Sequence, residues 1–271
     1  MEISNLTKDR IHDYLEAGKR FDGRGLFDYR DIVIETGISK NAEGSARVKL
    51  GETEVVAGVK LGVSEPYSDS PDEGALISGV EHLPLSSPSF ESGPPHIHAI
   101  EMARIVDRGI RESGFIDFKK MCIKEGEKVW VIFLDIYSIN DAGNLMDASA
   151  LAAIAALKTA RFPEYDKEAD KVIFGSLTDK KLPLTESMPI TLTFYKVNNA
   201  FVLDPILLEE ESSDMRISIA LSKQGKKIMI NACQKSGEAV ILKDELLSIF
   251  DKAIEKWKQI EPKIMKLIDK K

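Results

Sequence analysis

The stretch VWVIFLDIYSINDAGNLMDASALAAIAAL, residues 129–157, joins a very apolar segment to an alanine-rich one through a short polar loop. Residues 127–140 are apolar and rich in β-branched and aromatic side chains, which predicts a central strand buried on both faces. Residues 150–160 are rich in alanine, which has the highest helix propensity and lets a helix pack closely on a sheet. We therefore expect a helix that covers a sheet at this point.

The segments on either side predict further strands and helices. A first helix is expected over residues 6–18, a long polar loop over 64–79 and a strand over 79–86. The other expected strands are residues 31–37, 45–51, 53–63, 189–197, 200–206, 215–222 and 227–234, with a hairpin turn at Asn198-Asn199. A final amphipathic helix is expected from Asp244 to about Ile260, with one apolar side formed by Leu247, Phe250, Ile254 and Trp257.

Sheet followed by helix thus occurs in both halves of the chain, which predicts an α/β (α+β) protein. The charged segment RFPEYDKEAD, residues 161–170, is the candidate connector between the halves. We expect an N-terminal subdomain over residues 1–165, which includes the first helix, and a C-terminal subdomain over residues 166–271.

Composition restricts the classes of function. The chain has 271 residues and a net charge of −7, which argues against a surface that coats nucleic acid everywhere but leaves room for a local basic channel. No apolar run reaches the ~20 residues that cross a bilayer, and the polar N-terminal segment does not resemble a secretory signal. Cys122 and Cys233 lie far apart without a partner motif, so we expect free thiols and a cytoplasmic location.

Three arginines are spaced along one predicted helix, in HAIEMARIVDRGIRESG at residues 98–114. At ~100° per residue, Arg104, Arg108 and Arg111 lie within an arc of roughly 60°. The opposite side is apolar and is expected to face the core, with Met102, Ala103, Ile105, Val106 and Ile110. Their side chains could form surface ion pairs with Glu101 and Asp107, each of small energetic value. They could equally hold successive phosphates of an RNA strand, because guanidinium groups bind phosphate in a bidentate manner.

Two segments that could hold a phosphate or a catalytic centre are rich in carboxylates. In the loop before the alanine-rich helix, Asp141 and Asp147 would repel a phosphate, and we expect them to cap the helix instead. The acidic segment from Asp204 to Asp214 could hold Mg²⁺ or act in acid–base catalysis, but acidic loops are usually only solvated.

The remaining motifs predict no metal or cofactor. His96 and His98 form an H-x-H pattern without an evident third ligand. The chain contains no nucleotide-binding glycine motif, and neither cysteine stands beside a histidine.

The order of these segments resembles the RNase PH family from about residue 20 to 260. The resemblance is carried by RFDGRGLFDYR at 20–30, the strands at 44–63, the arginine helix, residues 129–157 and LDPILLEEE at 203–211. Within the family the chain is most similar to the non-catalytic RNase PH-like ring subunit of the archaeal exosome. EMARIVDR at 101–108 and EHLPLS at 81–86 are typical of that branch.

The resemblance implies an RNase PH-like fold of two sheet-plus-helix subdomains, the first similar to ribosomal protein S5 domain 2. It implies a hexameric ring of three heterodimers, in which this chain alternates with a catalytic RNase PH-like subunit. The implied partners are that subunit, RNA-binding cap subunits and single-stranded RNA, which phosphate degrades from its 3′ end. No membrane partner and no cofactor are implied.

The resemblance also implies roles for single residues. Active members carry Gly-Thr-Arg or Gly-Ser-Arg to hold phosphate, whereas here Gly143 is followed by Asn144 and Leu145. Active members also carry two aspartates six residues apart, matched here by Asp204 and Glu210, with Pro205 altering the motif. The resemblance therefore implies degenerate active-site positions and no catalytic residue in this chain.

Arg104 and Arg108 match positions that bind RNA phosphates in this branch, and Arg111 is the weaker assignment. Two alternatives remain: a self-sufficient phosphate-dependent 3′–5′ exoribonuclease that uses Asp204 and Glu210, and a scaffold whose arginines only form interface ion pairs.

Overall fold

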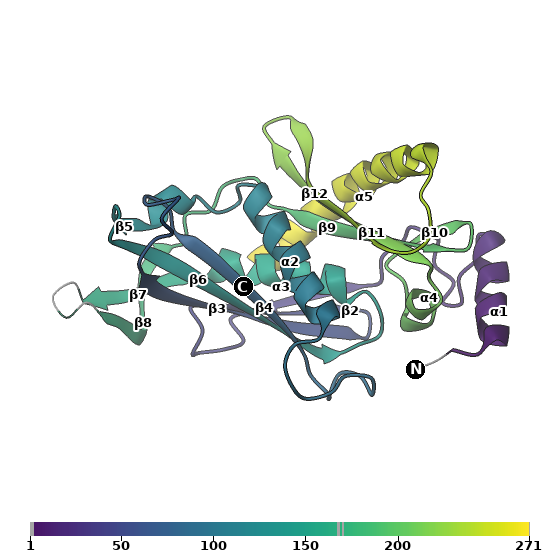
Figure 1. The fold of residues 1–271 in the computed structure, drawn as a ribbon, viewed down its shortest axis with the longest axis horizontal. Coiled ribbons are helices and arrows are strands. Elements are labelled where there is room, and N and C mark those ends of the chain that lie inside the picture. Colours follow the sequence, from purple (N-terminus) through teal and green to yellow (C-terminus); the bar gives the residue numbers. More distant parts are fainter. Residues whose placement is uncertain (1–2, 167–168, 170, 271) are drawn as a thin grey trace.

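A computed structural model describes residues 3–166, 169 and 171–270, and Figure 1 shows its layers. A six-stranded sheet has the order β1-β2-β3-β6-β4, with β5 paired to β6, and a four-stranded sheet has the order β10-β9-β11-β12. The first sheet consists of β1 (Ile32–Thr36), β2 (Gly44–Leu50), β3 (Thr53–Ser64), β4 (Ala75–His82), β5 (Cys122–Lys124) and β6 (Lys128–Asn140). The second consists of β9 (Ile190–Val197), β10 (Ala200–Leu203), β11 (Met215–Gln224) and β12 (Lys227–Gly237).

The helices are α1 (Asn5–Glu16), α2 (Ile97–Glu112), α3 (Leu145–Thr159), α4 (Leu207–Glu211) and α5 (Lys243–Asp269), with a 3₁₀ turn at Phe118–Met121. A separate two-stranded sheet, β7 (Arg161–Asp166) with β8 (Lys171–Lys181), projects from the body at the end opposite α1 (Figure 1). None of the described helices is long and apolar enough to span a membrane.

Helix α3 forms the centre of the core. Every residue from Leu145 to Leu157 is buried, and the helix contacts β2 and β3 of the first sheet and β9 of the second. Its alanines allow the close approach that the sequence predicts: a Cβ added to Gly44 of β2 would lie 2.7 Å from the Cα of Ala160. The two sheets thus pack on opposite sides of one small-residue helix.

The expected α/β (α+β) class is confirmed, and most strands lie where the sequence predicts them. The hairpin turn at Asn198-Asn199 is confirmed, with Asn198 in the left-handed region at φ 52°. The predicted loop over 64–79 is too long, because β4 already begins at Ala75 and pairs in parallel with β6. Both cysteines are free thiols, as expected.

Burial of β6 differs from the prediction. The strand is buried on both faces only from Val129 to Ile132, and from Phe133, which is 39 % exposed, its side chains alternate between core and solvent. On the second face, Val129 and Val131 pack in a small separate cluster with Ala75 of β4 and Cys122 of β5. Trp130 lies on the core face, where it contacts Phe162 and Tyr165 of β7 at ring distances of 5.1 and 5.8 Å.

Residues 161–166 of the predicted connector form a strand, β7. The many charged residues of this segment favoured a solvent-exposed loop, and the burial of Phe162 in the core was therefore not predicted. Residues 167, 168 and 170 of the same segment lie outside the described part of the chain.

The last helix, α5, is longer than expected and packs through a different face. Leu247 is 51 % exposed, so the predicted apolar side is wrong at its start. The helix continues past Pro262 to Asp269 and buries Ile249, Ala253, Trp257, Ile260, Ile264 and Ile268. Trp257 fixes this register, because its Nε1 donates a hydrogen bond to the carbonyl of Leu221 in β11 at 3.0 Å.

Candidate functional site

Helix α2 presents two of its three arginines to solvent without partners. Its opposite face is buried through Met102, Ala103, Ile105, Val106 and Ile110, as the periodicity predicts. Arg104 and Arg108 are exposed, and no hydrogen bond or ion pair to either occurs within the described residues.

Of the ion pairs expected on this helix, only the one between Asp107 and Arg111 forms among the described residues. Glu101 forms an ion pair with Arg216 of β11 at 2.6 Å, and Asp107 pairs with Arg111 at 3.0 Å. Surface ion pairs within the described chain therefore do not explain Arg104 and Arg108.

Arg111 has a different environment. Its Nε and Nη2 donate to the two carboxylate oxygens of Asp107 at 3.1 and 3.0 Å, and Nη2 also donates to the carbonyl of Leu76 at 3.1 Å. The guanidinium lies 5.9 Å from the ring centroid of Phe118. Arg111 is thus held against β4, and to bind an external phosphate it would have to exchange Asp107 for that phosphate.

The amino terminus of α3 is the place where a helix offers free N–H groups to an anion. Asn144 takes the left-handed conformation at φ 57°, and its N–H donates to Oε2 of Glu210 at 2.6 Å. Asp141 accepts the N–H of Gly143 at 3.1 Å. A carboxylate from 66 residues away therefore occupies the position that a phosphate would need.

The expectation that Asp147 caps α3 is wrong, because the helix turns this carboxylate into the core. Asp147 accepts hydrogen bonds from the hydroxyl of Tyr29 at 2.6 Å and from the hydroxyl of Thr193 at 2.7 Å. Burial raises the pKa of Asp147 to about 6, and these hydrogen bonds oppose the rise. Asp147 thus joins β9 to the segment before β1.

Asp204 is a completely buried acid of the site. Its backbone takes the left-handed conformation at φ 51°. Its carboxylate accepts five hydrogen bonds, from Arg24 Nη1, from the N–H, Nε and Nη2 of Arg30, and from Nδ2 of Asn144. With both oxygens used in this way, Asp204 has no free lone pair to offer a metal ion or a substrate proton.

Glu210 is engaged in a similar way. Besides the N–H of Asn144, it accepts the hydroxyl of Tyr195 at 2.9 Å. Burial is the main cause that raises the pKa of Glu210, so the side chain is a weaker acid than an exposed glutamate. The structure brings together Gly143, Asn144, Asp204 and Glu210, the positions that the resemblance singles out. The two carboxylates are hydrogen-bonded within the chain, whereas the side-chain oxygen of Asn144 is buried without a partner among the described residues.

A third acid, missed by the sequence reasoning, anchors the acidic segment. Arg20 donates from Nε and Nη2 to the two carboxylate oxygens of Glu209, and both side chains are completely buried. The signal was present in the sequence, because Arg20 opens the R-x-DGR motif and Glu209 lies within the acidic run. Because the two residues lie 189 positions apart, the sequence could not show that their side chains form an ion pair.

A cavity of about 400 Å³ opens beside this network, between the loop and α2. Its charged lining is mostly acidic, with Asp141, Glu210, Glu211 and Asp214. Its one arginine, Arg216, is already paired with Glu101. The cavity repels a phosphate ion, and within the described chain no group of three His, Cys, Asp or Glu side chains is placed to hold a metal ion.

Comparison with known proteins gives the family. Residues 28–163 match the model of the 3′ exoribonuclease family, domain 1, and residues 187–256 match domain 2 of the same family. The chain belongs to the RNase PH family of 3′ exoribonucleases. The two matched regions cover the six-stranded sheet with α2 and α3, and the four-stranded sheet with the first half of α5.

Individual relatives match over almost the whole chain. The "Exosome complex component Rrp42" of Methanocella arvoryzae is 43% identical over 262 residues, which is 97% of this chain and 96% of the relative. The protein of the same description from Methanothermobacter thermautotrophicus is 42% identical over 268 residues, 99% of this chain and 96% of the relative. A solved structure described as the Archaeoglobus fulgidus exosome with RNA bound to the active site contains a chain of 40% identity with a TM-score of 0.87, covering 96% of this chain and 98% of that one.

Proposed function

We propose that this chain is a ring subunit of an archaeal exosome that binds RNA and has no phosphorolytic centre of its own. The observation that carries the proposal is how the charges are partnered. Asp204 and Glu210 are occupied by groups of this chain, whereas Arg104 and Arg108 are exposed and unpaired within the described residues. Two arginines are thus free to bind the phosphates of RNA, whereas a carboxylate of the chain occupies the helix terminus where an attacking phosphate ion would bind.

The site explains why catalysis would have to come from a neighbour. Phosphorolysis needs a positive pocket for phosphate and an acid or metal near the scissile bond. Here the helix amide of Asn144 holds Glu210, the adjoining cavity is acidic, and Arg24 and Arg30 enclose Asp204. A catalytic RNase PH-like subunit, alternating with this chain in a hexamer of three heterodimers, would supply these groups.

Arg104 and Arg108 would then act as positioning residues. Lying on successive turns of α2, they can hold adjacent phosphates of a single strand that enters the neighbour's active site. Arg111 belongs to the same proposal in a weaker form because of its contacts with Asp107 and Leu76.

The descriptions of the relatives support the assembly, because they name exosome components and an RNA-bound exosome. RNA-binding cap subunits and a cytoplasmic location belong to the same proposal, and the free thiols of Cys122 and Cys233 are consistent with that location. The two family matches end at residue 163 and begin at residue 187, which is compatible with subdomains over 1–165 and 166–271.

One assay separates the proposal from a self-sufficient exoribonuclease. The purified chain is given end-labelled oligoadenylate, Mg²⁺ and inorganic phosphate, alone and assembled with its catalytic partner. We expect nucleoside diphosphate to be released only by the assembly. Release by the chain alone, abolished in Asp204→Ala, would overturn the proposal.

A second assay tests the arginines against the scaffold alternative. Assembled rings that carry Arg104→Ala with Arg108→Ala should form normally, with RNA binding weakened by at least about tenfold. Unchanged RNA affinity and turnover would show that these arginines serve only the interfaces.

A further inference from the structure

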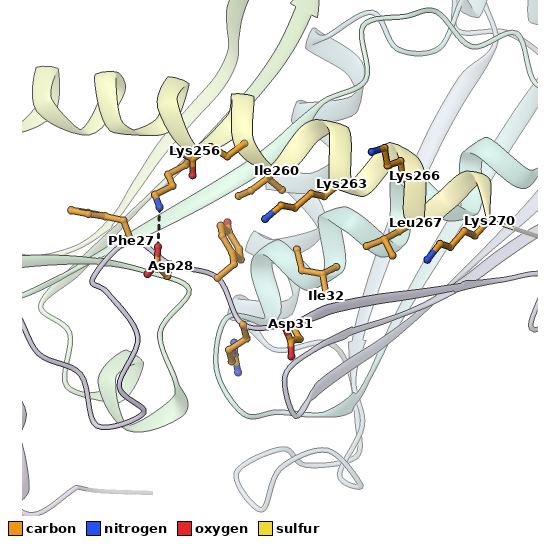
Figure 2. A pocket seen from close by; sticks show the side chains of 13 residues that line it. Phe27, Asp28, Asp31, Ile32, Lys256, Ile260, Lys263, Lys266, Leu267 and Lys270 are labelled. Atoms are coloured by element: carbon orange, nitrogen blue, oxygen red, sulfur yellow. Dashed lines mark hydrogen bonds and ion pairs between the residues drawn. The ribbon is translucent and has the colours of Figure 1, made fainter.

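A groove lined by lysines lies far along the chain from the arginines of α2. It runs between the second half of α5 and the segment from Phe27 to Ile32, and its volume is about 570 Å³. Figure 2 shows Lys256 extending from α5 to Asp28 of that segment, with Ile32 and Leu267 lying between the helix and β1. The four lysines of its lining are Lys256, Lys263, Lys266 and Lys270.

The positive charge of this groove is largely uncompensated. Lys256 forms an ion pair with Asp28 at 3.0 Å, and Asp31 adds one exposed carboxylate. Arg30 also lines the groove, but its guanidinium is committed to Asp204.

Lys263, Lys266 and Lys270 have no ion pair or hydrogen bond within the described chain. In a protein of net charge −7, such a local concentration of lysines favours an anionic partner.

The floor of the groove distinguishes between anionic partners. Its accessible apolar groups are aliphatic: Ile32 and Leu267 are both half-buried. Single-stranded RNA is usually bound by stacking its bases on open aromatic faces. Of the two aromatic residues in the lining, Phe27 contacts Phe194 and Lys252, and Tyr29 is held in place by the hydrogen bond of its hydroxyl to Asp147. An aliphatic floor suits the side chains of a peptide.

Backbone groups at one end of the groove are also available. Ile32 begins β1, which is the edge strand of the six-stranded sheet. Gly51 donates its N–H to the carbonyl of Asp31 at 2.9 Å, and in an antiparallel pair this direction alternates from one residue to the next. The N–H and carbonyl of Ile32 therefore point away from β2, where an extended peptide could bond to them.

We propose that this groove binds an extended acidic peptide segment of a protein partner, with aliphatic side chains on the floor and carboxylates on the lysines. The stretch of α5 from Lys256 to its end at Asp269 is about 20 Å long at 1.5 Å per residue. An extended segment of about six residues spans this length at roughly 3.3 Å per residue. This interaction is independent of RNA binding by α2 and of catalysis by the ring.

The probe that tests the groove is a fluorescein-labelled peptide of about eight residues, composed of glutamate with two leucines. Its binding to the full chain, alone and in the assembled ring, is measured by anisotropy. We expect Lys263→Glu with Lys266→Glu to weaken binding by about tenfold or more. The matched control, Lys243→Glu with Lys258→Glu, reverses two exposed lysines of the same helix outside the groove and should change binding less than twofold.

Two further measurements test the aliphatic floor. Leu267→Ser, and a probe whose leucines are replaced by serine, should each weaken binding by about tenfold. If the serine probe bound as tightly as the leucine probe, the groove would be only a nonspecific positively charged patch, and the proposal would be overturned. Equal losses in the groove variant and in its control would also overturn it.

The other possible occupants are outcomes of the same experiment. Tighter binding of an oligouridylate of equal charge, lost in the Lys263→Glu with Lys266→Glu variant, would assign the groove to RNA. Loss of peptide binding on ring assembly would assign it to a ring interface. Either result overturns the proposal, and neither bears on RNA degradation by the assembly.

Discussion

Arg30 holds the carboxylate of Asp204 through its backbone N–H, its Nε and its Nη2, at 2.8, 3.0 and 2.7 Å. The same guanidinium donates to the carbonyls of Ala142 and Gly143, at 3.0 and 2.9 Å. One side chain thus connects the segment before β1, the loop before α3 and the acidic segment. The site around Asp204 thus ties these three segments of the fold together.

The first prediction concerns this joint. Arg30→Ala leaves a buried carboxylate with fewer partners, so the free energy of unfolding should fall by about 3 kcal/mol. Urea denaturation of the purified chain measures the change. The control is Arg47→Ala, which removes exposed ion pairs to Glu35 and Glu54 and should cost less than about 1 kcal/mol. Equal losses in both variants would contradict the role of Arg30.

The second prediction uses the pH dependence of stability. Burial raises the pKa of Asp147 from 3.8 to about 6 in the folded protein, so the folded chain binds this proton more tightly than the unfolded chain. The contribution of Asp147 to the free energy of unfolding is fully present below about pH 4 and decreases as the pH rises to about 6. The decrease is on the order of 3 kcal/mol.

The measurement compares wild type with Asp147→Asn by urea denaturation between about pH 4 and pH 7. Because the amide does not titrate, the difference in stability should shift against the wild type as the pH rises. Parallel pH profiles of the two proteins would show that Asp147 keeps its ordinary pKa.

The third prediction concerns Gly143. It takes φ +94°, and an added Cβ would lie 2.6 Å from the backbone of Ile206 and Leu207. Gly143→Ala must move the loop away from the acidic segment, and we expect a loss of at least about 3 kcal/mol in thermal or urea unfolding. Gly225→Ala shares a positive φ, at +60°, but meets no atom within 4 Å, and should cost only about 1 kcal/mol.

The fourth prediction concerns the salt dependence of RNA binding. Each phosphate contact to single-stranded RNA contributes a slope of about 0.7 to the fall of log K with log salt. Rings carrying Arg104→Ala with Arg108→Ala should therefore show a slope shallower by about 1.4. The control, Arg47→Ala with Arg161→Ala, removes two arginines outside α2 whose side chains are 40% and 43% exposed, and it should leave the slope unchanged. An unchanged slope in the first variant would exclude both phosphate contacts.

The sequence predicted what depends on local periodicity. The two faces of α2 follow from the spacing of residues within one helix, so the buried Ile105 and the exposed Arg108 were both assigned correctly. For α5 the same reasoning failed at Leu247, because several faces carry apolar residues and only docking onto β11, through Trp257, selects one. Where a helix has more than one apolar face, tertiary contacts decide the register.

The site was only half predictable for a similar reason. The sequence indicates that the loop at 141–147 is unsuited to phosphate, because acids stand where cations are needed. It could not show that Glu210 caps α3 while Asp147 turns inward, since these partners are set by contacts across 66 and 46 residues of chain. The buried pair of Arg20 and Glu209, 189 residues apart, was beyond reach for the same reason.

The contact of Glu210 with the amide of Asn144 has a consequence for engineering. A basic side chain introduced at position 144 would not restore an anion pocket, because the glutamate would still sit on the helix amide. Replacing Glu210 as well would leave Asp204 inside its arginine cage. If this chain has no phosphorolytic centre, as proposed, building one would therefore require coordinated replacements in three distant segments.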